Sequence, residues 1–237
     1  MQRILIQLDT DPQPSAFDRV VAIDAGVEQL FSYGGVTPEN VTPLVHGAMF
    51  TRGPSDLKHT ALFIGGSQVA DGEALLAAIR KIFFGPIRVS VLCDSNGANT
   101  TAAAAVCCAL RHVAPEETTA LVLGGTGPVG LRAARLLAQQ GIAVKLASRS
   151  VVRAEEACRS ICNAVPGSTL SPCSSDASGL RDALAGVNLL IAAGAAGVSF
   201  LPEDEWRPHP DLRVAIDLNA VPPAGLGGIG ATDKAVV

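Results

Sequence analysis

The sequence predicts an α/β fold built from two parallel-sheet α/β domains. Short apolar runs alternate with amphipathic stretches along the chain of 237 residues, the order that produces parallel sheets covered by helices. The pattern restarts after a short linker, APEET, at 114–118. We therefore expect an N-terminal α/β domain over residues 1–113 and a second α/β domain over residues 114–237.

In the first domain the apolar runs predict four strands, of which the second is weak. The intervening stretches predict helices, with Thr37 as N-cap and Pro38 at the first position of one of them. Gly85 and Pro86 stop another. The expected strands are 3–9, 28–33, 60–66 and 87–94, and the expected helices are 15–24, 37–50, 67–84 and 95–113.

In the second domain the same alternation predicts four strands and three helices. The stretch PGSTLSPCSSD, at 166–176, is polar and rich in turn residues, so we expect a loop there. A Gly/Ala loop follows the third strand. The expected strands are 119–124, 142–147, 187–192 and 212–218, and the expected helices are 128–140, 151–164 and 178–185.

Composition excludes several classes of protein. Apolar residues make up 48% of the chain and charged residues 17%, which indicates a globular protein. The net charge is −4 and no Lys/Arg block occurs, so we expect no nucleic-acid partner. The N-terminal apolar run is too short for a signal peptide, and no run approaches the length of a membrane span, about 20 residues. The six cysteines show no metal-binding spacing, and we expect reduced thiols, no metal site and a cytoplasmic location.

The glycine motif Gly125-x-Gly127-x-x-Gly130 follows an apolar strand and opens a helix. That context is typical of a Rossmann-type dinucleotide-binding fold. We expect Gly125 to permit the tight turn, Gly127 to let a pyrophosphate approach the backbone, and Gly130 to let the helix pack on the strand. The alternative is a glycine-rich turn that binds no ligand.

The next predicted strand ends at Ala147 and is followed by Ser148, Arg149 and Ser150. NAD-binding folds favour an acidic residue here, which would repel the 2′-phosphate of NADP. Arginine pairs with phosphate, and serine hydroxyls can donate to its oxygens. The sequence therefore favours NADP, with NAD as a weaker possibility, unless Arg149 is merely a solvated loop residue.

Residues that handle protons are scarce. The chain has one tyrosine and four scattered histidines, and the second domain has no Tyr-x-x-x-Lys pair. Alcohol oxidation needs a base, whereas oxidation of a carbon that bridges two nitrogens releases no proton. The sequence is compatible with the second chemistry and predicts no catalytic acid or base.

Small polar residues gather in DSNGANTT, at 94–101, between a strand and a helix. Helix capping alone needs only one such residue. We expect substrate contacts, with capping by Asp94, Ser95 or Asn99 as the alternative. Asp217 and Asn219 end another strand, where ligands of doubly wound folds lie, although ordinary turn chemistry would also explain them.

Five stretches together resemble the bacterial NADP-dependent methylene-tetrahydromethanopterin dehydrogenases, a family that also acts in part on methylene-tetrahydrofolate. Within them, DSNGxNTTAAA and NAxPPxGxGGIxATDK are far more specific than the glycine motif. The stretches lie at 7–21, 33–41, 83–106, 124–141 and 217–234.

The resemblance implies hydride transfer from a reduced pterin or folate one-carbon carrier directly to NADP, with the substrate in a cleft and no metal or flavin. We also expect a homo-oligomer. Relatives continue past ATDK, so a last strand and helix of the fold are expected to be missing. The implied cofactor residues are Gly125, Thr126, Gly127, Pro128, Val129, Gly130, Ser148, Arg149, Ser150, Ala193 and Gly194, and the implied substrate residues are Asp94, Asn96, Asn99, Thr100, Thr101 and Asn219.

Two other functions remain open. SRSVVRA resembles the NADP-reading turn of shikimate dehydrogenase-like reductases, but those enzymes need a Lys–Asp pair in the first domain. Lys58 lies in an expected loop and Lys81 late in an expected helix, so no such lysine is evident. The other alternative is a non-catalytic NADP-binding module.

Overall fold

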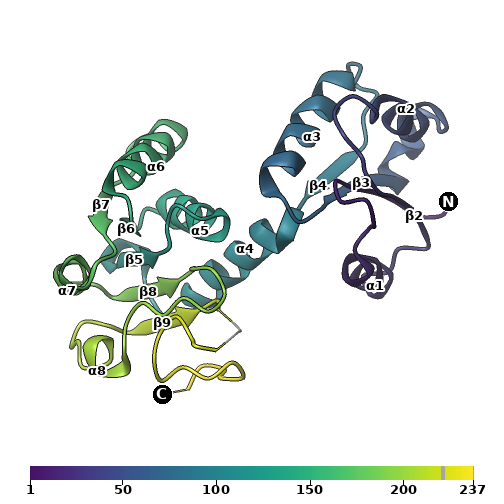
Figure 1. Cartoon of the computed structure of the whole chain (residues 1–237). Coiled ribbons are helices and arrows are strands. Elements are labelled where there is room, and N and C mark those ends of the chain that lie inside the picture. The colour runs from purple at the N-terminus through teal and green to yellow at the C-terminus, as the bar shows by residue number, and fades with distance from the viewer. Residues whose placement is uncertain (220–221, 237) are drawn as a thin grey trace. The chain divides into compact units, whose positions relative to one another are not determined.

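The computed structural model describes residues 1–219 and 222–236 and divides into two compact units, Met1–Asn99 and Thr100–Val237 (Figure 1). The division lies earlier than the predicted boundary at 113/114. The reason is helix α4 (Ala98–Ala109), whose Ala102, Val106 and Ala109 pack into the core of the second unit. The alanine-rich helix therefore belongs to the second unit by its packing.

The first unit is a four-stranded parallel sheet in the order β2-β1-β3-β4. Leu8, Leu62 and Ile64 on the inner strands are fully buried, so the central strands form the core. The strands are β1 (Ile4–Asp9), β2 (Gln29–Tyr33), β3 (Thr60–Gly65) and β4 (Ser90–Cys93), and the helices are α1 (Ala16–Asp24), α2 (Thr42–Phe50) and α3 (Val69–Ile82), with 3-10 turns η1 (Pro54–His59) and η2 (Ser95–Gly97).

Helix α2 begins at Thr42 and not at Pro38, so the predicted cap at Thr37 is wrong. Thr37 instead closes a separate turn, in which its N–H donates to Asn40 Oδ1 at 2.8 Å. Pro43 lies inside the predicted helix and has no N–H to donate to a preceding turn. Its place in the first turn of α2 fits that restriction.

The second unit is a five-stranded parallel sheet in the order β7-β6-β5-β8-β9. Numbered within the unit this is 3-2-1-4-5, which follows the Rossmann order. The predicted fold class is confirmed. The strands are β5 (Thr119–Leu123), β6 (Ala143–Ser148), β7 (Leu170–Ser174), β8 (Leu189–Ala192) and β9 (Val214–Asp217), and the helices after α4 are α5 (Pro128–Gln139), α6 (Val151–Ala164), α7 (Ala177–Leu184) and α8 (Glu203–Trp206), with η3 (Pro115–Glu117) before β5.

Both faces of this sheet are covered, as the continuous apolar runs predict. Val122 and Val144 face a cluster formed with α4, α5 and α6. Leu121 and Leu123 face a second cluster, formed with α7 and Trp206 of α8. Among the described residues no helix combines the length and the apolar character needed to cross a membrane.

Strand β7 occupies the stretch that we expected to be a loop. Its pairing with β6 includes Pro172, opposite Leu146. A proline has no N–H to donate to a ladder, but β7 is an edge strand, so one of its sides has no partner strand that needs a donor. The short helix α8 was also not predicted.

Candidate functional site

The glycine loop between β5 and α5 is held by close backbone approaches. Gly124 has φ +67, and a Cβ there would lie 2.8 Å from the carbonyl oxygen of Ala193. A Cβ on Gly125 would lie 2.5 Å from Cγ of Leu146. The left-handed backbone of the turn is thus at Gly124, which the sequence motif does not include, whereas Gly125 is required for packing against β6.

The other two glycines of the motif differ from each other. A Cβ on Gly130 would lie 2.5 Å from Gly124 O and 2.9 Å from Gly125 Cα, so helix α5 can approach the loop only with glycine there. A Cβ on Gly127 would meet only Gly124 O, at 3.2 Å, and Ala193 O, at 3.9 Å. The remaining space beside Gly127 is open, which is what the approach of a diphosphate to the backbone requires.

The N-terminus of α5 lies at this open space. Gly127 is its N-cap, no side chain caps the helix, and Pro128 in the first turn has no N–H to satisfy. The amides of the first turn are therefore directed beyond the helix end, where the positive end of the helix dipole attracts an anion. This loop fits the diphosphate of a dinucleotide.

In the turn after β6, Ser148 has a structural role, whereas the neighbouring Arg149 is exposed. Ser148 is only 6% exposed, and its hydroxyl pairs with Thr126 Oγ1 at 3.0 Å. The same hydroxyl accepts the N–H of Ser150 at 3.3 Å. Ser148 and Thr126 thus tie the glycine loop to this turn.

Arg149, in contrast, is exposed and forms no ion pair with any residue in 1–219 or 222–236. Ser150 is the N-cap of α6, accepting the N–H of Arg153 at 3.4 Å, and the first turn of α6 contains no acid. The turn therefore offers a guanidinium and a helix N-terminus without a competing carboxylate, which fits a phosphate.

The loop after β8 lies against the glycine loop. Ala193 N–H donates to Leu123 O at 3.0 Å, and Ala193 O is the atom nearest to a Cβ at Gly124. A Cβ on Gly194 would lie 2.4 Å from Cε2 of Phe200, so glycine is needed there too. Sequence reasoning missed Gly124 and Phe200, although the Gly124–Gly125 pair was a usable signal for a turn with a positive φ.

In the first unit, DSNGANTT forms the junction between β4 and the helix that follows. Asp94 is 8% exposed, and its Oδ1 accepts the N–H of Asn99 at 2.8 Å. Asn99 Nδ2 donates to Cys93 O at 2.6 Å. The capping alternative is therefore observed for Asp94, whereas the side chain of Asn99 ties the helix start back to the end of β4.

The remaining predicted substrate residues of this stretch are more accessible. Asn96 is exposed and has φ 54, a left-handed conformation that is uncommon outside glycine. Its N–H donates to Gly66 O at 2.8 Å, which fixes the turn on the end of β3. Thr100 is exposed and Thr101 half-buried.

Buried polar groups also end β1. Asp9 is 1% exposed, and its carboxylate accepts the N–H groups of Asp11 and Ser15, both at 3.0 Å. Gln7, also 1% exposed, accepts from Ser32 Oγ at 2.8 Å. Sequence reasoning missed Gln7, whose signal was a lone amide within an apolar run.

Asp18, on α1, belongs to the same edge of the sheet. Burial raises the pKa of its carboxyl above the ordinary value, a hydrogen bond with Ser15 opposes the rise, and the charges of Asp9 and Asp94 add to it. The carboxyl ends of β1 and β4 therefore concentrate negative charge.

Asn219 and Asp217 close the loop after β9. Asp217 accepts the N–H of Asn219 at 2.9 Å and that of Leu226 at 3.0 Å. Asn219 is 8% exposed, and its Nδ2 donates to Pro223 O at 3.2 Å. Turn chemistry is thus observed, and a substrate contact of Asn219 remains a prediction.

The comparisons with known proteins give a consistent result. Residues 16–96 match the family model described as "Methylene-tetrahydromethanopterin dehydrogenase, N-terminal". The chain is 41% identical over 235 residues to "Bifunctional protein MdtA" of Methylorubrum extorquens (strain AM1), covering 98% of this chain and 82% of that protein. It is 34% identical over 232 residues to the "NAD(P)-dependent methylenetetrahydromethanopterin dehydrogenase" of the same organism, covering 91% of this chain and 75% of that protein.

Among solved structures, quinate dehydrogenase from Corynebacterium glutamicum in complex with NAD matches with a TM-score of 0.51 and 15% identity, over 83% of this chain and 72% of that one. A likeness at this identity supports the fold only. The two relatives, in contrast, are 41% and 34% identical along almost the whole chain. The chain belongs to the methylene-tetrahydromethanopterin dehydrogenase family.

Proposed function

We propose that this protein transfers a hydride from the methylene bridge of methylene-tetrahydromethanopterin, or of methylene-tetrahydrofolate, to NADP. The product is the methenyl form, and the reaction belongs to one-carbon metabolism. The observation that carries this proposal is the 34% identity, over 91% of this chain, with the NAD(P)-dependent methylenetetrahydromethanopterin dehydrogenase. The glycine loop and the Arg149 turn supply independent support for the cofactor.

The nicotinamide ring of NADP supplies the hydride acceptor. We assign the diphosphate to the open backbone at Gly127 and the first turn of α5, with Gly125, Thr126, Pro128, Val129 and Gly130 forming the loop. We assign the 2′-phosphate to Arg149, in the turn that Ser148 and Ser150 hold. Ala193 and Gly194 would lie beside the cofactor. NAD would bind more weakly, because Arg149 would have no phosphate to pair with.

The proposed reaction does not require the protein to transfer a proton. When the C–H bond of the methylene carbon breaks, the hydride leaves with both electrons, and the lone pairs of the two flanking nitrogens stabilise the cation that remains. No proton leaves, so the protein's task is to orient the two reactants. We propose that Asp94, Asn96, Asn99, Thr100, Thr101 and Asn219 contact the substrate, and that no side chain acts as an acid or a base.

An absorbance assay at the reduced-nicotinamide band tests the proposal. Each carrier, methylene-tetrahydromethanopterin and methylene-tetrahydrofolate, is combined with NADP and with NAD. We expect reduced nicotinamide to form with at least one carrier, and faster with NADP than with NAD. Saturable NADP binding without turnover of either carrier would contradict the proposed enzymatic activity and favour a non-catalytic NADP-binding module.

The assembly and the location of the protein are parts of the proposal that need separate tests. We propose that the chain self-associates, since Phe17, Val20 and Phe31 of the first unit are large apolar side chains with 77%, 61% and 47% exposure. Sedimentation velocity would reveal a monomer if this is wrong. We also propose a cytoplasmic location, which agrees with six free cysteines and is tested by cell fractionation.

A further inference from the structure

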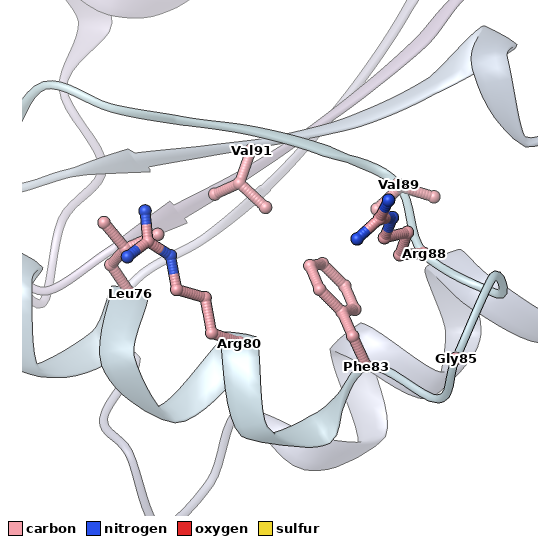
Figure 2. A pocket seen from close by; sticks show the side chains of 7 residues that line it. All are labelled: Leu76, Arg80, Phe83, Gly85, Arg88, Val89 and Val91. Carbon is pink, nitrogen blue, oxygen red and sulfur yellow. The ribbon is translucent and has the colours of Figure 1, made fainter.

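The first unit contains a pocket of about 440 Å³ between the end of α3 and the segment that leads into β4. The chain reverses between Phe84 and Ile87, whose backbone groups pair with each other, and Gly85 takes φ +55 in the turn. This reversal places Arg88 across the pocket from Arg80 (Figure 2). The residues that line the pocket are Leu76, Arg80, Phe83, Gly85, Arg88, Val89 and Val91.

The charge of the pocket is unbalanced. Two arginines line it and no carboxylate does, although the chain as a whole has a net charge of −4. Neither Arg80 nor Arg88 forms an ion pair with any residue of the described ranges. Both arginines are exposed, so their charges are accessible to an anion from the solvent.

The floor of the pocket is apolar. Figure 2 shows Val91 and Phe83 between the two arginine side chains, with Leu76 beside Arg80. Val89 is 6% exposed and joins the core of the unit, so this floor is fixed by packing. The pocket thus combines two cationic groups at its rim with a rigid apolar surface beneath them.

We propose that this pocket binds a phosphate monoester, with the phosphoryl group between Arg80 and Arg88 and the organic part on Phe83 and Val91. A guanidinium pairs with two oxygens at once. One arginine satisfies a carboxylate, whereas a phosphoryl dianion has enough oxygens for both. The pocket is also larger than a bare phosphate fills, which leaves room for an apolar group.

This site is separate from the proposed substrate residues. Arg88 precedes β4 and Asp94 follows it, and a strand rises about 3.3 Å per residue, so their Cα atoms are roughly 20 Å apart. A ligand between the arginines would therefore not contact Asp94. The proposal goes beyond the proposed function and does not depend on it.

The experiment is a titration of the full chain with phenyl phosphate, followed by ¹H–¹⁵N NMR at constant ionic strength with NADP present to occupy phosphate sites of the second unit. We expect saturable shifts of the amides of residues 83–91. Arg80→Gln and Arg88→Gln should each weaken binding about tenfold or more, since each removes charged hydrogen bonds. The control is Arg19→Gln, which removes an exposed arginine of α1 that has no ion pair within the described ranges, and it should bind as the wild type does.

Several results would overturn the proposal. One is an absence of shifts in the amides of 83–91 of the wild type. Another is an unchanged titration of the Arg80 and Arg88 variants whose remaining spectra confirm folding. Phenol and inorganic phosphate separate the two parts of the site. Both should bind more weakly than phenyl phosphate, and phenol binding as tightly would contradict the role of the arginines. Because the readout is by residue, failure of NADP to bind would be seen separately, at the glycine loop.

Discussion

Arg149 is the residue on which the choice between NADP and NAD depends in our proposal. It is exposed and has no carboxylate partner among the described residues, so its charge is available to a 2′-phosphate. Replacing Arg149 by Ala should lower the NADP/NAD preference in kcat/KM about tenfold or more, because a charged hydrogen bond contributes about 1.5–3 kcal/mol. The change should come mainly from weaker NADP binding.

The matched control is Arg159→Ala, which removes an exposed arginine from the second half of α6, the helix that follows Arg149. It should leave the preference unchanged. If Arg149→Ala and Arg159→Ala gave the same NADP/NAD ratio as the wild type, Arg149 would be a solvated loop residue and the assignment would be wrong.

Asp18 makes stability depend on pH in a direction that can be tested. Burial raises its pKa above 3.8, so the folded state holds the proton more tightly than the unfolded state. Its contribution is therefore fully favourable below pH 3.8 and is lost as pH rises through the folded-state pKa. At pH 7 the ionised carboxylate opposes folding, next to Asp9 and Asp94.

We therefore expect Asp18→Asn to raise Tm at pH 7 relative to the wild type, and the gain to shrink as pH falls towards 3.8. Thermal unfolding of both proteins between pH 3.5 and pH 7 measures this difference. The contributions of titrating groups that both proteins share cancel in the difference between the two Tm values. A Tm difference that stays constant with pH, or that grows in acid, would contradict the raised pKa.

At the scale of single residues, the sequence predicted where polar side chains lie along the chain, but it did not determine whether each one caps a turn or contacts a ligand. Asp94, Asn99 and Asn219 do follow strands, as the pattern predicted. Their hydrogen bonds to Asn99 N–H, Cys93 O and Pro223 O depend on the turns that the chain makes after each strand. Residue types and spacing do not determine those turns, so capping and ligand contact could not be separated.

The glycine loop and α5 form one structural element. Substitution of its different glycines should have different effects on stability and on NADP affinity. Gly130→Ala would place a Cβ 2.5 Å from a backbone oxygen that cannot move away cheaply. We expect it to lower the free energy of unfolding by about 1–3 kcal/mol, the usual cost of overpacking. NADP affinity should fall as well, because the loop and the helix end would shift.

Gly127→Ala should separate binding from stability. Its Cβ would meet only a contact of 3.2 Å within the loop and would otherwise occupy the open space. We expect an unfolding free energy within about 1 kcal/mol of the wild type together with a clear loss of NADP affinity. Chemical denaturation and a binding titration on both variants decide the matter, and unimpaired NADP binding by Gly127→Ala would contradict our placement of the diphosphate.

Two helices of the first unit should lose very different amounts of stability when an apolar side chain is truncated. Phe17 on α1 is 77% exposed, whereas Leu75 on α3 is 0% exposed. Leu75→Ala should cost about 2–5 kcal/mol through a buried cavity. Phe17→Ala should change the unfolding free energy by less than about 0.5 kcal/mol. Urea unfolding measures both, at a protein concentration where sedimentation shows a monomer, and a large loss at Phe17 under those conditions would contradict the prediction.

At the scale of elements, the alternation of strands and helices was predictable wherever a strand is buried on both faces. β5 is such a strand, and its apolar run identifies it directly. β7 is an edge strand of half-exposed and polar residues with a proline, so its local pattern is that of a loop. Its existence depends on pairing with β6, which is a tertiary effect that local sequence does not encode.

For the whole molecule, the main consequence of the fold is that stability resides in separate cores. One cluster of buried residues draws only on the first unit, with Leu8, Ile64 and Leu75 among its members. The two clusters around the second sheet draw only on the second unit. The linker APEET suggested this division from the sequence, but the packing of α4 sets where it falls.

NADP should therefore protect the two units unequally. A ligand that binds only the folded state stabilises it by about 2.7 kcal/mol at a hundredfold excess over Kd. Since the proposed NADP residues lie in the second unit, we expect slower hydrogen exchange with NADP in β5, β6 and the glycine loop, and little change in α3. Arg149→Ala should reduce the effect at the same NADP concentration. Equal protection of α3 would mean that cofactor binding couples the two cores, and would contradict their independence.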